Sequence, residues 1–427
     1  MTEQKPAIVL TPYRSTMPLV QPLMQMGFEV WLPDVQVAQQ TPGTFALQQL
    51  IDGTTHMAAL SEAAMLDAKM VAGLMSQTIY QRFEKELDTL TFSRNGRDGK
   101  DVKPFVLSGL QQWFPGWVQQ SMARQILWLK AVERLCTERE VRAVVVQDDV
   151  QEITKALCLF AAAHGIPSVH VPHAVYLDWG HGETGYDVHD VVSADWVCAA
   201  GWHQAEWYKA RGARRIDTTG LPQRDIHAEL SKMRDREAAC RQFKLDPAKP
   251  VVVYFSSWQQ DTAAQGFHDG ISVAFKSVLN AAKGADWQLL VKTHPSAQVE
   301  NAKWHAKIAD EMEVSCLVTD NHLNATYQAA DLWLAFGTSN TIIEAAIYGI
   351  PLISIAGFAE DGAVITCGDA QESISSAIEQ ALSDDWQEWY KGENEAFLAK
   401  YNGDADGLAT DRVVERIARL AGKGQVV

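Results

Sequence analysis

The chain lacks the cysteine spacing that would mark a disulfide framework or a zinc site. Its 427 residues include six cysteines, and no two of them form a CxxC pair. Scattered cysteines indicate reduced thiols, so we expect a cytoplasmic protein, with a position at the inner face of the membrane left open. MTEQKPAIVL passes from a short polar start into a strand pattern, and we therefore expect no signal peptide.

Excess positive charge and long apolar runs are also absent. The 37 Lys and Arg residues against 53 Asp and Glu give a formal net charge of −16. This charge opposes general binding to nucleic acid or to an anionic bilayer. Residues 156–177 carry no charged side chain, but they contain Pro167, Pro172 and three histidines. This pattern favours a buried helix, a turn and a strand over a membrane span.

Several catalytic and metal-binding motifs are missing as well. There is no Walker A or GxSxG sequence, and GHGETG (180–185) matches GxGxxG without a helical pattern after it. Histidines and aspartates crowd residues 164–190, but their spacings match no established set of metal ligands. We therefore expect no bound metal and no separate cofactor.

What is present is a repeated strand-helix pattern. The length favours two domains, and 47% hydrophobic with 21% charged residues is a globular composition. AIVLTPY, VRAVVVQDD and SVHVPH read as strands of a first α/β domain, with a helical insertion at about 44–139. After a charged helical stretch, PVVVYFSSW restarts the pattern. We predict domains at 1–235 and 236–384, and a helical tail at 385–427.

Polar clusters follow two strands of the second domain. Gln288–Lys292 is followed by Thr293, His294 and Pro295, and Leu332–Ala335 by a Gly-Thr-Ser-Asn sequence at 337–340. In an open parallel sheet, ligands bind beyond the carboxyl ends of the strands, where a helix N-terminus favours phosphate. The sequence therefore predicts a site for a phosphorylated ligand at this edge.

Three segments carry a family resemblance. GLPQRD (220–225), VKTHPS (291–296) and GTSNTIIEAAIYGIPLISI (337–355) resemble, in order and spacing, GT-B enzymes that build bacterial surface polysaccharides. The similar families are capsule Kdo and sialic-acid transferases, teichoic-acid glycerophosphotransferases and UDP-GlcNAc 2-epimerases. The resemblance spans about 141–355. It implies an α/β GT-B fold, in which two Rossmann-like domains face each other across a cleft.

The resemblance also assigns donor-side roles. His294 would contact the donor phosphate, Glu344 would bind ribose hydroxyls, and the remaining donor-binding candidates are Ser256, Ser257, Lys292, Thr338, Ser339 and Asn340. Each has a structural alternative. His294 or Ser339 could cap a helix, Lys292 could be a solvated strand-end lysine, and Glu344 could be a structural carboxylate.

Acceptor-side candidates lie in the first domain. Asp148 and Asp149 end a strand, and His173 stands where the similar families often have His-Gly, here His173-Ala174. One of these groups could take the acceptor proton as a general base. The alternative for the acid pair is a role at a helix N-terminus, because EITKAL follows directly.

These assignments predict a metal-independent glycosyltransferase. It would move a sugar from a nucleotide-activated donor, with a CMP-linked sugar as one candidate, to a glycan or lipid-linked acceptor. A glycerophosphotransferase, a UDP-GlcNAc 2-epimerase-like enzyme and a degenerate GT-B scaffold protein remain alternatives. Trp113, Phe114 and Trp117 could make a peripheral membrane contact, but a packed aromatic cluster is the preferred interpretation. The oligomeric state is left open.

Overall fold

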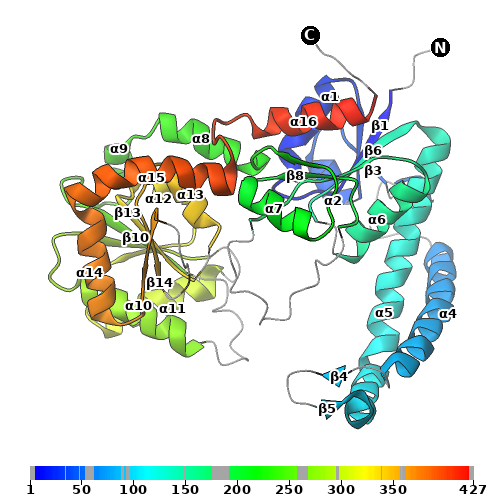
Figure 1. Ribbon diagram of the computed structural model, residues 1–427, viewed down its shortest axis with the longest axis horizontal. Helices are drawn as coiled ribbons and strands as arrows, with labels where there is room; N and C mark the ends of the chain where they lie inside the picture. The colour runs from blue at the N-terminus through cyan, green and yellow to red at the C-terminus, as the bar shows by residue number, and fades with distance from the viewer. Residues whose placement is uncertain are drawn as a thin grey trace.

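Two parallel β-sheets, each covered by helices on both faces, lie side by side in the chain (Figure 1). The computed structural model describes residues 5–33, 35–47, 49–52, 62–87, 91–92, 97–148, 151–175, 192–256, 268–294, 298–337, 339–355, 357 and 362–422. Among these residues, no helix is long and apolar enough to cross a bilayer.

The first sheet has the strand order β3-β2-β1-β6-β7-β8-β9, and all its pairings are parallel. Its strands are β1 (Ala7–Leu10), β2 (Glu29–Leu32), β3 (Phe45–Ala46), β6 (Val141–Val146), β7 (Ser168–His170), β8 (Trp196–Ala199) and β9 (Ile216–Thr218). Alternate residues of β1 point to opposite faces, so Ile8 and Leu10 join one buried cluster and Ala7 and Val9 another. Burial on both faces explains why these strands read as continuous apolar runs.

The helices of the first domain divide between these two faces. Those bordering the first sheet or connecting its strands are η1 (Met17–Leu19), α1 (Val20–Gln25), α2 (Val35–Gln40), α3 (Gln49–Asp52), α5 (Gly99–Glu138), α6 (Glu152–Ala163) and α7 (Trp202–Ala210). Helix α1 packs on the face with Ile8, while α5 and α6 pack on the face with Val9.

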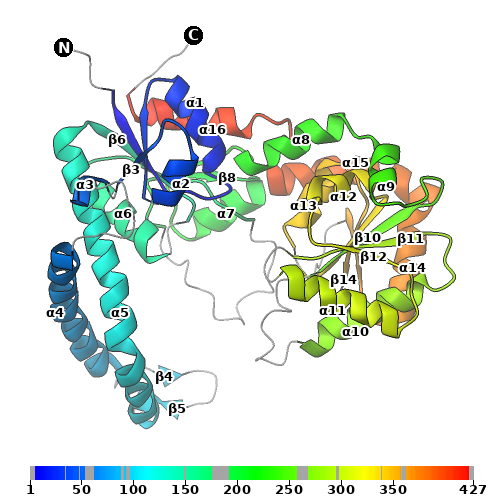
Figure 2. The ribbon, with the colours of Figure 1, turned by 180° about the vertical axis from the view of Figure 1, so that it is seen from behind.

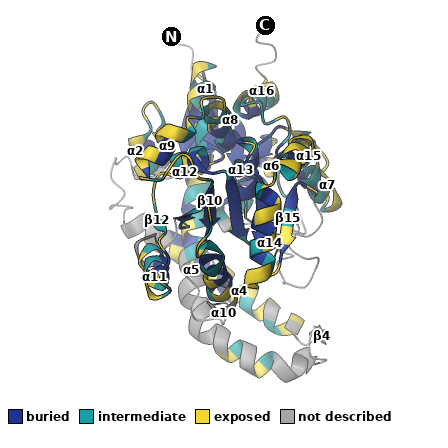
Figure 3. Cartoon of the chain, turned by 90° about the vertical axis from the view of Figure 1, so that its left-hand side faces the viewer, coloured by how far each residue is buried: buried dark blue, intermediate teal, exposed yellow. Residues whose placement is uncertain are grey.

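The second sheet has the order β12-β11-β10-β13-β14-β15, again fully parallel. Its strands are β10 (Val251–Phe255), β11 (Gln288–Lys292), β12 (Leu317–Thr319), β13 (Leu332–Phe336), β14 (Leu352–Ile355) and β15 (Val364–Cys367). The helices around it are α9 (Arg236–Gln242), α10 (His268–Ala282), α11 (Gln298–Glu311), α12 (Leu323–Ala329), α13 (Thr341–Ile347), α14 (Gln371–Leu382) and α15 (Asp384–Asn402). Figure 3 shows the central strand β10 buried among these helices, and its neighbour β13 is buried from Leu332 to Ala335.

The chain passes between the domains twice. The first passage runs through η4 (Pro222–Arg224) into α8 (Asp225–Lys232), which contacts α12 and α13. The second runs from α15 into α16 (Ala409–Leu420), whose Val413 and Ile417 pack in the core of the first domain. Figure 2 shows α16 lying along the first domain beside α1, so the C-terminal tail returns to the domain that begins the chain.

A helical hairpin projects from the first domain. It consists of α4 (Glu62–Leu87) and the long α5, with the short antiparallel pair β4 (Thr91–Phe92) and β5 (Arg97–Asp98) at its far end (Figure 1). The predicted helical pattern from residue 44 differs at its start, because Phe45 and Ala46 form the edge strand β3. Phe45 stacks on Trp31 of the neighbouring strand, with ring centroids 4.9 Å apart.

The predicted α/β class with two Rossmann-like domains is confirmed. The interpretation of residues 156–177 is also correct, because α6, a turn and β7 occupy the described part of that stretch. The predicted boundary between residues 235 and 236 falls between α8 and α9, both of which pack with helices of the second domain.

Candidate functional site

The residues that follow β10, β11 and β13 meet at one edge of the second sheet. These strands are neighbours, and Phe255 is in register with Lys292 on one side and with Ala335 on the other. Ser256, Thr293 and Gly337, which follow these three strands, therefore lie just beyond the carboxyl ends of neighbouring parallel strands, where ligands of such sheets bind. We call this edge the donor edge.

Ser256 and His294 are joined at the donor edge. Ser256 is fully buried, and its hydroxyl oxygen accepts from the His294 amide at 3.0 Å and from Asn301 Nδ2 at 3.5 Å. The half-buried His294 ring lies edge-on to Phe255, with centroids 6.1 Å apart. Ser256 thus fixes the backbone of His294, and the imidazole is the group of this pair that is open to the surface.

Lys292 is buried rather than solvated. Its ammonium donates to the carbonyl oxygens of Thr293 at 2.6 Å and Asp320 at 3.2 Å. Burial lowers the pKa of Lys292 to about 8, although the nearby Asp320 carboxylate opposes this shift. The side chain therefore ties the end of β11 to the end of β12, beneath the donor edge.

The loop after β13 turns sharply into α13. Gly337 has a φ of +67°, a conformation that glycine adopts without strain, and its carbonyl accepts from Ser354 Oγ at 2.9 Å. Ser339 Oγ lies 2.9 Å from Thr341 Oγ1, and the Ile342 amide donates to the Ser339 carbonyl. Because the Ile342 amide already donates to the Ser339 carbonyl, a phosphate bound here would depend on donors that precede Ile342 in the chain.

Asn340 joins this loop to the first domain. Its Oδ1 accepts from the Val175 amide at 2.8 Å and from Arg224 Nη2 at 3.0 Å, and its Nδ2 donates to the Val175 carbonyl at 3.2 Å. The side chain of a predicted donor residue therefore holds the segment that follows β7. We call this set of three contacts the Asn340 clasp.

Arg224 completes the clasp from the first interdomain passage. It is 3% exposed, and its Nη1 donates to Asn402 Oδ1 at the end of α15 at 2.8 Å. Burial lowers the pKa of Arg224 to about 10, while the Glu344 carboxylate opposes the shift. A buried cation thus connects the donor loop, the first passage and the second passage.

Glu344 faces a cluster of aromatic and imidazole groups. It accepts from the Tyr327 hydroxyl at 2.5 Å, and its Oε2 lies 3.8 Å from His227 Nε2. Burial lowers the pKa of His227. Burial raises the pKa of Tyr327, and the Glu344 carboxylate raises it further. These contacts give Glu344 a structural role, and its side chain is 19% exposed.

On the first domain, Asp148 caps a helix. Its Oδ1 accepts from the Gln151 amide at 2.8 Å and from Thr154 Oγ1 at 2.7 Å, and Gln147 Nε2 donates to its Oδ2 at 3.1 Å. These bonds satisfy the start of α6, as expected for an acid at a helix N-terminus. The structure therefore engages both carboxylate oxygens of Asp148 in capping and local packing.

His173 lies next to the clasp. It precedes Val175 by two residues, its ring meets Tyr13 edge-on with centroids 5.0 Å apart, and its carbonyl accepts from Gln223 Nε2 at 3.0 Å. His173 therefore belongs to the segment that Asn340 holds through Val175, although Asn340 is far from this segment in sequence. Of the two acceptor-side candidates that the structure describes, His173 is the one whose segment contacts the second domain.

Some predicted site residues lie outside the described residues. These are Asp149, Ser257 and Thr338, together with the side chains of Trp113, Phe114 and Trp117. Much of the segment rich in His and Asp, at 176–191, is also outside. Within the described part of the chain, no group of three or more His, Cys, Asp or Glu side chains could hold a metal ion.

Sequence reasoning missed two partners in the site. Arg224 stands inside the GLPQRD motif, but a surface arginine and a buried clasp residue look alike in sequence. Asn402 gave no signal, because it contacts Arg224 across 178 residues.

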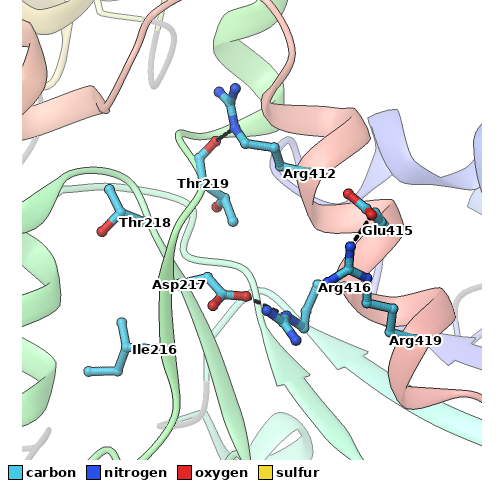
Figure 4. Close-up of a pocket in the computed structure, with 8 residues that line it drawn as sticks. All are labelled: Ile216, Asp217, Thr218, Thr219, Arg412, Glu415, Arg416 and Arg419. Carbon is cyan, nitrogen blue, oxygen red and sulfur yellow. Dashed lines mark hydrogen bonds and ion pairs between the residues drawn. The ribbon is translucent and has the colours of Figure 1, made fainter. Parts of the chain in front are cut away.

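A groove of about 350 Å³ lies between β9 and α16, away from these residues (Figure 4). Three arginines line it, and each already has an acidic partner: Arg412 with Asp406, Arg416 with Asp217, and Arg419 with Glu415. The other lining residues are Ile216, Thr218 and Thr219, so no predicted site residue borders the groove. Its charges hold α16 to the edge of the first sheet.

Comparison with known proteins gives fold relatives only. No protein-family model matches the chain, and no curated protein matches it in sequence. Among solved structures, UDP-GlcNAc 2-epimerase from Neisseria meningitidis, solved with UDP-GlcNAc, is 13% identical, with 97% of this chain and 99% of that chain covered and a TM-score of 0.54. A glycosyltransferase from Rickettsia africae is 11% identical, with 98% and 100% covered and a TM-score of 0.53.

The wall teichoic acid polymerase TagF is also similar, at 10% identity, with 99% of this chain and 90% of that chain covered and a TM-score of 0.51. These likenesses extend over nearly the whole chain, so they include both of its parallel sheets. The protein therefore has a GT-B fold, and the resemblance seen in the sequence is confirmed at the level of fold.

Proposed function

We propose that this protein is a glycosyltransferase that takes a nucleotide-activated sugar as donor and a glycan or lipid-linked molecule as acceptor. The observation that carries the proposal is the Asn340 clasp, in which Val175, two residues after His173, is bonded to the loop after β13 of the second domain. A GT-B fold with polar groups from both domains at this contact between the domains suits a transfer between two bound substrates. The fold relatives include a glycosyltransferase and a polymerase.

The proposed chemistry assigns one role to each domain. The acceptor hydroxyl oxygen attacks the anomeric carbon, and the bond between that carbon and the donor phosphate oxygen breaks. His173 takes the proton of the hydroxyl, and the nucleotide leaves with the bonding electron pair on its phosphate. His294 and Ser339 stabilise that departing phosphate by hydrogen bonds, and no metal ion takes part. Glu344, whose side chain is 19% exposed, would bind the ribose hydroxyls.

A second candidate is an epimerase that inverts one carbon of a UDP-linked sugar. The likeness to an epimerase solved with UDP-GlcNAc favours it. The two candidates differ in what they need, because an epimerase converts its nucleotide sugar without an acceptor. A CMP-linked acidic sugar is the donor candidate from the sequence resemblance, and a UDP-linked sugar is the choice that the fold relatives favour.

A thermal-shift screen tests the donor site. The panel is CMP, CDP, UDP, GDP and their sugar conjugates, with and without magnesium. A ligand that binds only the folded state stabilises it by ~2.7 kcal/mol at a concentration of ~100 Kd. We expect one nucleotide to raise the melting temperature equally with and without magnesium. The shift should vanish in His294→Ala and persist in His164→Ala, a control at an exposed histidine of the first domain.

Turnover assays separate the candidate functions. Nucleotide released only when an acceptor is present supports the transferase, and a new UDP-sugar epimer formed from UDP-GlcNAc alone supports the epimerase. Nucleotide binding with neither product would make the chain a GT-B binding subunit. If no nucleotide shifts the melting temperature, the donor edge as described is wrong.

A further inference from the structure

The projecting hairpin is packed through small side chains. Ala68 and Ala72 of α4 are fully buried and meet Ala123 and Leu127 of α5 in a separate small core. Small residues let the two helix backbones approach closely, but they bury little apolar surface. The close α4–α5 contact therefore uses alanines of α4, although that helix also carries several large apolar side chains.

Those large side chains lie on the outside of α4. Leu66, Met70 and Leu74 form one row, and Val71, Met75 and Ile79 form a second, with residues four apart in each row. All six are exposed, by 44 to 69%. Residues four apart on a helix lie one above the other and form a ridge, so α4 presents two parallel apolar ridges to the solvent.

We propose that these two ridges are a dimer interface, on which α4 of a second copy of this chain packs. Helices pack by fitting the ridges of one into the grooves of the other, and rows with a spacing of four interdigitate with rows of the same kind. A two-fold axis brings the same surface of both copies together. The ridge pattern of α4 is therefore complementary to itself.

The exposed area is sufficient for a small stable interface. At roughly 180–200 Å² for each fully exposed residue, the six side chains present roughly 600 Å² per copy, at the upper limit of the apolar patches on monomers. Two copies would bury roughly 1,200 Å², the lower end of the range for specific interfaces.

Charge favours a second copy over a bilayer. Helices that lie on membranes carry a polar face rich in Lys and Arg. In α4 the four acids outnumber the three bases: Glu62, Asp67, Glu84 and Glu86 against Lys69, Arg82 and Lys85. Between the first and last ridge residues the only charges are Asp67 and Lys69, which have opposite signs, so two copies meet without net repulsion.

Sedimentation equilibrium of the full chain tests the proposal. We expect wild-type protein to reach twice the chain mass between about 1 and 100 μM. Leu74→Glu should weaken dimerisation at least ~100-fold, because each dimer would bury two unpaired carboxylates. Leu159→Glu is the matched control, since Leu159 is an equally large and 57% exposed residue on α6. Unchanged circular dichroism and melting temperature would show that each variant folds.

Three results would overturn the proposal. One is a wild-type monomer at the highest concentration. Another is a Leu74→Glu dimer as tight as the wild type, with Met70→Lys as a second check on the same ridge. The third is a monomer that binds vesicles of phosphatidylcholine and phosphatidylglycerol through Leu74, which would make the ridges a membrane contact.

Discussion

Removing the Asn340 side chain should release the first domain from the donor loop. Asn340→Ala deletes the acceptor of the Val175 amide and of Arg224 Nη2, and the donor to the Val175 carbonyl. A neutral hydrogen bond contributes about 1 kcal/mol net, and one to a charged group about 1.5–3 kcal/mol. Water entering the opened contact between the domains recovers part of this sum. We therefore expect about 3 kcal/mol of lost local stability.

Hydrogen exchange at Val175 measures this loss directly, because its amide is one of the clasp donors. A loss of about 3 kcal/mol corresponds to ~100-fold faster exchange of that amide. A local measurement is preferable to a melting temperature, since a two-domain chain need not unfold in one step. One peptide in mass spectrometry, or one cross-peak in NMR, that reports the Val175 amide is sufficient to follow its exchange.

Two further variants make the test specific. Asn340→Asp keeps an acceptor for both N–H donors and adds an ion pair with Arg224, so exchange should stay within ~10-fold of wild type. Asn321→Ala makes the same deletion at an exposed residue after β12 and should change nothing at Val175. If Asn340→Ala leaves the exchange of Val175 at its wild-type rate, the clasp does not hold the domains together and the reasoning fails.

Other consequences follow from particular contacts. Asp148→Ala should lower the free energy of unfolding by ~1–2 kcal/mol, because it removes a helix cap. Asp148→Asn should keep both the stability measured by urea denaturation and the transfer activity. If Asp148→Asn lost activity but kept stability, Asp148 would be the general base. Burial lowers the pKa of fully buried His305 to about 4, so it stays neutral while the unfolded chain is protonated. Stability should therefore fall by ~3 kcal/mol as pH drops from 6.5 to 4, and His305→Phe should remove that slope in urea titrations. Gly201→Ala would place a Cβ 2.2 Å from the Lys400 carbonyl oxygen and should lower the melting temperature, whereas Gly392→Ala, with open space around it, should not.

The sequence was sufficient to predict the two sheets and the donor edge. Runs such as VVVYF and LWLAF are apolar at every position because helices cover both faces of a parallel sheet, and that pattern is local. The alternative role of Asp148 as a helix cap was also visible, because its partners Gln151 and Thr154 lie within six residues.

The clasp could not be predicted in this way. Asn340 meets Val175 and Arg224 across 165 and 116 residues, and no periodicity links such positions. The sequence suggested a phosphate ligand at Asn340, because an Asn before a helix can bind a phosphate as well as it can bind the backbone of another domain. Lys292 shows the same limit from the other direction, since its apparent position at a solvated strand end gave no sign of the carbonyl groups that surround it.

The two interdomain passages lie together, and this determines how the two domains can move relative to each other. Asp225 at the start of α8 accepts from the amides of Ala409 and Thr410 at the start of α16, at 3.0 and 2.7 Å. Arg224 adds the bond to Asn402 at the end of α15. A double passage fixed at one point allows rotation about that point more readily than separation of the domains. The Val175–Asn340 contact adjoins this pivot, because Arg224 bonds to both Asn340 and Asn402. Any rotation that moves Val175 away from the loop after β13 has to break this contact, while the bonds between Asp225 and the start of α16 can persist.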